Sequence, residues 1–191
     1  MARIRTFIAV ELAAGVKERL VKLQEELGRT AGNVKWVAPA NMHLTLLFLG
    51  DVEELEVVAI CRVVRERSHR HAPFTFDSEG LGAFPNSRRP KILWAGITGG
   101  VESLRALHAD LEEGLLQLGC YRREERAYSP HLTLGRLKHD DGGEAWGPIL
   151  QKHADWQGGS TPVDEVVVMS SEQRRDGPEY SIMGRGALGG R

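Results

Sequence analysis

The pattern of apolar and polar positions predicts a strand, a helix and a second strand in the first part of the chain. Residues 4–12 (IRTFIAVEL) are apolar and β-rich enough for a largely buried strand. An amphipathic helix follows, and Gly28 is its expected C-terminal stop. Its apolar stripe consists of Val16, Leu20, Leu23 and Leu27. After a loop, residues 41–50 (NMHLTLLFLG) form an aliphatic run closed by glycine, which indicates a second strand.

The same order of elements recurs in the second half. Residues 91–97 (KILWAGI) predict a strand, and a leucine stripe that stops at Gly119 predicts a helix. The run at 129–137 (SPHLTLGRL) predicts the matching strand and contains the tetrad HLTL for a second time. Helices therefore alternate with strands, which is typical of a mixed α/β fold of the α+β type.

Equal spacing supports an internal duplication. Ile4 lies 39 residues before His43, and Ile92 lies 39 residues before His131. We therefore predict one domain over 1–191 made of two similar lobes related by a pseudo-twofold axis. Its expected parts are repeat units at roughly 1–88 and 89–183 and a loose tail at 184–191.

Further elements are expected around these two units. They are a helix containing Leu55 to Val64, short strands at 73–78 and 81–85, a short helix within 143–156, and strands at 163–171 and 179–183.

The repeated tetrad carries the candidate chemistry. Residues two apart on a strand share a face, so His43 lies beside Thr45 and His131 beside Thr133. The intervening leucines, which are Leu44, Leu46, Leu132 and Leu134, are expected in the core. One such pair is most simply a solvent-facing strand edge, but two at matched positions of a repeat indicate a functional pair.

Two histidines facing one cleft suit acid–base catalysis, because one can take a proton while the other gives one. Each threonine offers a hydroxyl donor to an anionic oxygen. The set suits in-line displacement at a phosphorus with two non-bridging oxygens, with no carboxylate and no metal required.

On these residues the chain resembles the 2H phosphoesterases, named for two His-x-Thr-x (HXTX) motifs, and within them the RNA 2′,3′-cyclic phosphodiesterases, also described as 2′-5′ RNA ligases. The segments that carry the resemblance are RTFIAVEL, Trp36, NMHLTLLFLG, WAGI, YSPHLTLGR and VVVMSSEQ with GPEYSI. The resemblance implies a bilobal fold with central antiparallel sheets flanked by helices and an active-site groove between the lobes. It also implies metal-independent hydrolysis of a 2′,3′-cyclic phosphate to a 2′-phosphomonoester.

Carried over by position, the resemblance makes His43 the proton donor and His131 the proton acceptor. Thr45 and Thr133 match phosphate-binding hydroxyls. Arg136 matches a basic residue and Phe48 a base-stacking aromatic. Both lie at the opposite strand parity from their histidines, so a regular strand turns them away. Gly135 can mark a bulge that resets the parity before Arg136, but no such signal precedes Phe48.

Composition limits the class of protein. The chain is 41% hydrophobic and 27% charged with a formal net charge of -1, which argues against a broadly basic nucleic-acid-coating surface. Cys61 and Cys120 are far apart and belong to no paired motif, which fits a reducing compartment. With no signal-like segment and no apolar run of membrane length, we expect a soluble, cytoplasmic protein without a membrane partner.

Three alternatives stay open at this level. A metal site is one, using further histidines at 69, 71, 108, 139 and 153, although no HExxH spacing occurs. The second is a module that binds an RNA end without catalysis, and the third is ATP-independent 2′-5′ ligation, since no P-loop is present. We expect no cofactor, an RNA or nucleotide with a cyclic phosphate end as partner, and a monomer, because the repeat supplies its own twofold.

Overall fold

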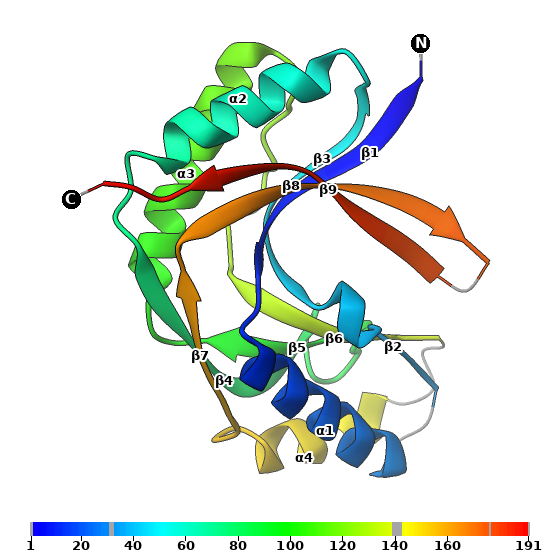
Figure 1. The fold of residues 1–191 in the computed structure, drawn as a ribbon. Coiled ribbons are helices and arrows are strands. Elements are labelled where there is room, and N and C mark those ends of the chain that lie inside the picture. The colour runs from blue at the N-terminus through cyan, green and yellow to red at the C-terminus, as the bar shows by residue number, and fades with distance from the viewer. Residues whose placement is uncertain (1, 31–32, 139–142, 176, 191) are drawn as a thin grey trace.

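The computed structural model describes residues 2–30, 33–138, 143–175 and 177–190, which form two antiparallel sheets flanked by helices (Figure 1). Sheet A has the order β3 (His43–Glu53), β1 (Arg3–Glu11), β8 (Glu165–Arg174) and β9 (Gly177–Ala187). Sheet B has the order β2 (Val34–Trp36), β6 (His131–Leu137), β5 (Ile92–Ile97), β4 (Phe74–Phe84) and β7 (Gln157–Val163). The predicted mixed α/β class is confirmed.

The two sheets repeat one strand order, but they exchange strands between the halves of the chain. β3-β1-β8-β9 in sheet A corresponds to β6-β5-β4-β7 in sheet B, so each HLTL strand lies beside the first strand of its own half. β4, however, pairs with β5, and β8 pairs with β1. Each exchanged strand covers what is otherwise an open sheet edge. The predicted boundary between 1–88 and 89–183 therefore does not divide the sheets.

The pairing of the strands shows that Ile4 and Ile92, each 39 residues before a histidine, are not equivalent positions. Phe7 lies opposite Phe48 in sheet A, and Ile92 lies opposite Arg136 in sheet B. Phe48 and Arg136 are each five residues past their histidine, so Phe7 rather than Ile4 is the structural equivalent of Ile92. The equal 39-residue spacing read from the sequence does not connect equivalent positions, because the segment between the two strands is longer in the second half.

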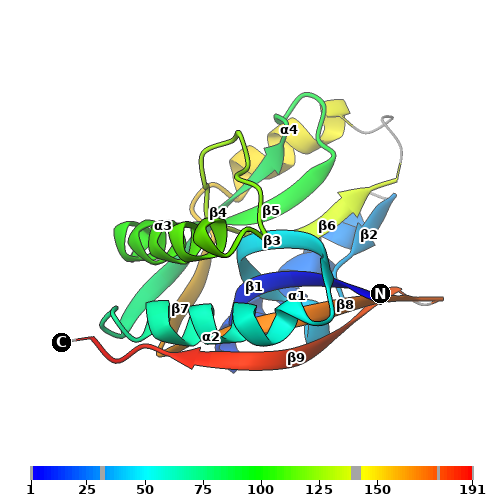
Figure 2. The ribbon, with the colours of Figure 1, turned by 90° about the horizontal axis from the view of Figure 1, so that it is seen from above.

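Helices pack at opposite ends of the molecule. α2 (Glu56–Ser68) and α3 (Val101–Leu118) pack against each other, and α2 covers β8 and β9 of sheet A (Figure 2). α1 (Ala14–Thr30) contacts β7, and α4 (Gly143–Lys152) contacts β4, both on sheet B (Figure 1). The predicted stripes of α1 and α3 are buried in one core shared by both sheets.

Some predicted boundaries are wrong. Gly28 lies inside α1, which continues to Thr30, so it does not end the helix. Gly119 does end α3, with a φ of 80°. The tail expected at 184–191 is wrong over its first part, because β9 continues to Ala187 and Leu188 is buried.

Two strands of the structure, β2 and β7, were not predicted. The two short strands predicted at 73–78 and 81–85 belong to one strand, β4. β7 has the sequence QGGSTPV, and β2 has only three residues, so neither shows apolar alternation. Each forms because a neighbouring strand supplies hydrogen-bond partners. β4 runs through both predicted short strands, with Gly80 at a φ of 68° beside a register shift. Among the described residues, no helix has the length and apolar character needed to cross a membrane.

Candidate active site

Each HLTL strand contains a bulge at its fourth position. In β3, Thr45 lies opposite Ala9 and Leu47 opposite Ile8, so Leu46 is the extra residue. In β6, Leu134 is the extra residue at the equivalent place. A bulge adds one residue and so reverses the alternation of side chains beyond it. All four leucines predicted for the core are buried, as expected.

The bulges return the last two candidate residues to the histidine face. Phe48 lies opposite Phe7, and the Phe7 ring centroid is 4.9 Å from that of His43. Arg136 lies opposite Ile92, two residues from Trp94, whose ring centroid is 6.4 Å from that of His131. The regular alternation that would turn Phe48 away does not hold, because β3 has the same irregularity as β6 without a glycine to signal it.

A buried glutamine holds the bulge of β6. Gln24 Nε2, on α1, donates to the carbonyls of Leu134 and Val37 at 2.9 Å each. The same Leu134 carbonyl accepts from the Val37 amide at 2.9 Å. Gly135 follows because an added Cβ would come 2.6 Å from Val34 Cγ1 in β2. The glycine thus reflects the close approach of β2.

Both histidine rings are oriented by the same backbone contact. His43 Nδ1 lies 2.8 Å from the Asn41 carbonyl, and His131 Nδ1 lies 2.8 Å from the Ser129 carbonyl. A carbonyl only accepts, so Nδ1 carries the proton in each ring, and in the neutral ring Nε2 is the free base. Each ring therefore presents Nε2 for chemistry.

The two rings differ in their surroundings. His43 Nε2 lies 3.0 Å from Thr45 Oγ1, so in the neutral ring the hydroxyl donates to it. Burial lowers the pKa of His43, the hydrogen bond to Asn41 opposes this, and the charge of Lys17 lowers it further. Among the described residues, His131 Nε2 and the Thr133 hydroxyl have no hydrogen-bond partner.

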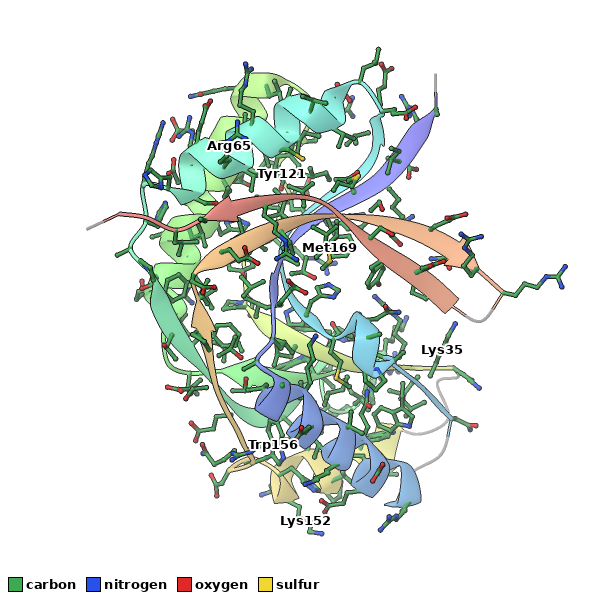
Figure 3. All side chains as sticks on the ribbon, in the orientation of Figure 1. Lys35, Arg65, Tyr121, Lys152, Trp156 and Met169 are labelled. Atoms are coloured by element: carbon green, nitrogen blue, oxygen red, sulfur yellow. The ribbon has the colours of Figure 1, made fainter. Side chains whose placement is uncertain are left out.

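Aromatic side chains pack around each histidine. Tyr180 of β9 meets His43 edge-on at 5.5 Å and Phe7 at 5.0 Å. Phe84 of β4 meets His131 edge-on at 4.9 Å. Beneath Tyr180, Phe7, Ala9, Val167 and Met169 form a small apolar cluster separate from the main core, with Met169 on the side of sheet A that faces sheet B (Figure 3). We call this side the site face of sheet A.

Two hydrogen bonds and one electrostatic effect join the parts of the site. Tyr128, just before β6, donates its hydroxyl to the Thr45 carbonyl at 3.2 Å and so links β6 to β3. Asn41 Nδ2 donates to the Pro178 carbonyl at 2.7 Å, which ties the β8–β9 hairpin to the segment before His43. Burial raises the pKa of Tyr180, and the charges of Arg136 and Arg5 oppose the rise. The charge of Arg136 on sheet B therefore acts on Tyr180 of sheet A.

The remaining histidines lie elsewhere. His71 contacts Asp110 at 3.1 Å, His153 contacts Glu26 at 3.1 Å, and His108 stacks on Tyr128 at 4.1 Å between ring centroids. His69 is exposed on the surface. His139 lies outside the described residues. Within the described ranges, no three histidine, cysteine or acidic side chains gather closely enough to hold a metal ion.

A surface hollow between β4 and α4 contains none of the predicted site residues, and its lining has no titratable side chain. It is lined by Leu81, Gly82, Ala83, Ser87, Gly147, Pro148, Leu150, Gln151 and Ala154. The hollow therefore offers no acid, base or charge for the chemistry that the histidines suggest.

Sequence reasoning missed the residues that position the histidines. Asn41 and Ser129 lie two residues before each histidine, so comparing the repeats position by position would have found them. Tyr128, Tyr180 and Arg5 had no such signal, because β9, β1 and the loop before β6 meet at the site only in the folded chain.

Comparison with known proteins agrees with this geometry. A family model described as LigT like Phosphoesterase matches residues 10–94. A protein of Methanothermobacter thermautotrophicus named RNA 2′,3′-cyclic phosphodiesterase is 34% identical, over 95% of this chain and 97% of that protein. One of the same name from Aquifex aeolicus is 28% identical over 100% of both. The solved structure of TT0787 from Thermus thermophilus has a TM-score of 0.84 at 28% identity and covers 98% of this chain and 100% of that one. The chain therefore belongs to the LigT-like phosphoesterases of the 2H superfamily, and it is a phosphodiesterase.

Proposed function

We propose that the enzyme hydrolyses the 2′,3′-cyclic phosphate ends of RNA to 2′-phosphomonoesters without a metal ion. The observation that carries this proposal is the matched pair of histidines, each held through Nδ1 and each presenting Nε2. Relatives named RNA 2′,3′-cyclic phosphodiesterase support the substrate class. A cytoplasmic location is part of the proposal and fits two free cysteines.

The proposed reaction is an in-line displacement in a groove between the sheets. His131 Nε2 takes a proton from water as the water oxygen bonds to phosphorus on one side. On the other side the bond from phosphorus to O3′ breaks, and His43 Nε2 gives O3′ its proton. The phosphate stays on O2′. The Thr45 and Thr133 hydroxyls donate to the non-bridging oxygens, and Arg136 balances the charge that develops there.

The lowered pKa of His43 fits an acid that is charged by its substrate. In the free protein the ring is predominantly neutral near pH 7, and Thr45 donates to it. A bound phosphate anion favours the imidazolium, because opposite charges raise the pKa of a histidine. The Thr45 hydroxyl is then released from Nε2 to donate to the phosphate. Substrate binding and protonation of the acid are thereby coupled.

The test uses an oligoribonucleotide with a 2′,3′-cyclic phosphate end, incubated with the enzyme in EDTA. We expect conversion to the 2′-phosphate, identified by chromatography against 2′- and 3′-phosphate standards, and loss of most activity in His43→Ala and His131→Ala. Activity abolished by EDTA and restored by zinc or manganese would overturn the metal-free mechanism. Binding without turnover would replace hydrolysis by the RNA-end binding function.

The separate roles are tested with an activated aryl leaving group, which departs without protonation. His43→Ala should be partly rescued on this substrate, because only the acid becomes dispensable. His131→Ala should stay inactive, because water still needs its base. Rescue of His131→Ala instead would reverse the assignment.

A further inference from the structure

A tyrosine ahead of the second tetrad contacts the strand that carries the first. Tyr128 lies three residues before His131, and its hydroxyl donates to the Thr45 carbonyl at 3.2 Å. β3 and β6, which carry the two tetrads, also contact each other between the sheets. The hydrogen bond therefore joins the segment that leads into the proposed base to the strand that holds the proposed acid, His43.

The accepting carbonyl lies at the bulge of β3. Thr45 immediately precedes Leu46, the extra residue, so the regular ladder of hydrogen bonds is interrupted at this point. In β6, the carbonyl of the extra residue, Leu134, accepts from Gln24. Each bulge therefore has a side-chain donor from a distant segment of the chain, and the donor for β3 is Tyr128.

The Tyr128 ring is held in place, and its hydroxyl keeps its proton. The ring stacks on His108 of α3, with the ring centroids 4.1 Å apart and the ring planes 9° from parallel. Burial lowers the pKa of His108, and the charges of Glu112 and Glu124 oppose this. Burial raises the pKa of Tyr128, so the phenol remains a donor over the range in which the histidines titrate.

We propose that Tyr128 is a positioning residue that fixes the first His-x-Thr pair relative to the second. In-line displacement requires the acid and the base on opposite sides of phosphorus, so an error in the placement of one strand separates its histidine from the reacting atom. Tyr128 opposes such an error because it is three residues from the base, while its acceptor is two residues from the acid. The role rests on the proposed function and adds a bond that aligns the two halves of the site.

Tyr128→Phe tests the role, because it keeps the stacked ring and removes the hydroxyl. On the oligonucleotide with a cyclic phosphate end, we expect kcat to fall about tenfold to a hundredfold, the size that a displacement of roughly 1 Å can cause, with KM nearly unchanged. On the substrate with an activated aryl leaving group the loss should be several times smaller, because that reaction does not use the acid. A merely structural role would lower both rates by the same factor.

Tyr121→Phe is the matched control. It removes a phenol hydroxyl from the same segment, where the hydroxyl donates to Glu112 at 3.3 Å. Tyr121 lies on the side of sheet A that α2 covers, away from the site face (Figure 3). The control should keep the wild-type rates on both substrates.

An NMR titration of the histidine rings in the free protein gives a second readout, which needs no turnover. The Thr45 hydroxyl donates to the neutral His43 ring and so favours the neutral form, which means that a displaced Thr45 in Tyr128→Phe should raise the pKa of His43 above its wild-type value. Equal losses on both substrates, or a His43 titration identical to that of the wild type, would overturn the positioning role. A wild type that hydrolyses neither substrate would instead refute the proposed function.

Discussion

At the scale of single residues, the two threonines occupy matched positions but are in different states. Thr45 hydrogen-bonds to its own histidine, whereas the Thr133 hydroxyl has no partner among the described residues. In the proposed mechanism both turn to the phosphate, so each contributes a donor that strengthens as charge develops. The Thr133 hydroxyl can donate to the phosphate as soon as it binds. The Thr45 hydroxyl can do so only after His43 is protonated.

Replacing Thr45 or Thr133 by valine keeps the shape of the side chain and removes the hydroxyl. We expect each variant to lower kcat by roughly tenfold to a thousandfold, the size seen when one transition-state donor is removed. Thr75→Val, at an exposed position of β4, is the control and should keep wild-type turnover. Turnover rates that stay at the wild-type value in both site variants would leave the threonines with a structural role only.

The pH dependence follows from the lowered pKa of His43. The reaction needs one histidine charged and one neutral, so kcat/KM should rise and then fall around two apparent pKa values that belong to the pair. An NMR titration of the free enzyme should give His43 a pKa below the ordinary 6.5, and a bound phosphate anion should raise this pKa. A His43 pKa at or above 6.5 in the free enzyme would contradict this account.

At the scale of elements, the bulges decide which side chains reach the site. A one-residue slip in a strand sends every following side chain to the other face. The bulge in β6 is stabilised by α1 through Gln24, so a helix far away in sequence sets where Arg136 points. The strand β6 and the helix α1 together therefore position this part of the site.

Gln24→Leu tests this unit. The substitution removes the donor to two buried carbonyls, which should lower the free energy of unfolding by about 1–3 kcal/mol. We also expect a lower kcat/KM, because Arg136 loses its fixed placement. Gln151→Leu, on the exposed surface of α4, should change stability by less than about 0.5 kcal/mol. Urea denaturation measures both, and a Gln24 variant as stable as the control would contradict this account of the bulge.

At the scale of the whole molecule, each sheet supplies one histidine and one threonine of the proposed site. The strand order of sheet A is repeated in sheet B, and one core is shared between them. Exchange of β4 and β8 between the halves makes each sheet depend on the other half of the chain. Neither half is expected to fold alone.

Because both histidines and both threonines come from one chain, the site needs no second copy. We therefore expect sedimentation velocity to give a single species near the chain mass of 21.1 kDa. Specific activity should be independent of enzyme concentration over the same range. A dimer that loses activity as it dissociates on dilution would contradict this expectation.

The sequence by itself determined the features that repeat locally. The leucines of each tetrad are buried, and the α1 and α3 stripes face the core, because side-chain alternation and helical periodicity depend only on neighbouring residues. The duplicated tetrad also led to the family and to the candidate catalytic pair, since identical residues at matched positions are visible without a structure.

Only the tertiary structure decided how the halves combine. Whether β4 joins the first or second half, whether Leu46 bulges, and whether Tyr180 reaches His43 all depend on strand pairing between distant segments. Such pairing is set by the hydrogen-bond partners that neighbouring strands offer, and no short window of sequence contains them. For this reason the alternation along β3 could not decide which face Phe48 occupies, while it assigned the leucine two residues before it correctly to the core.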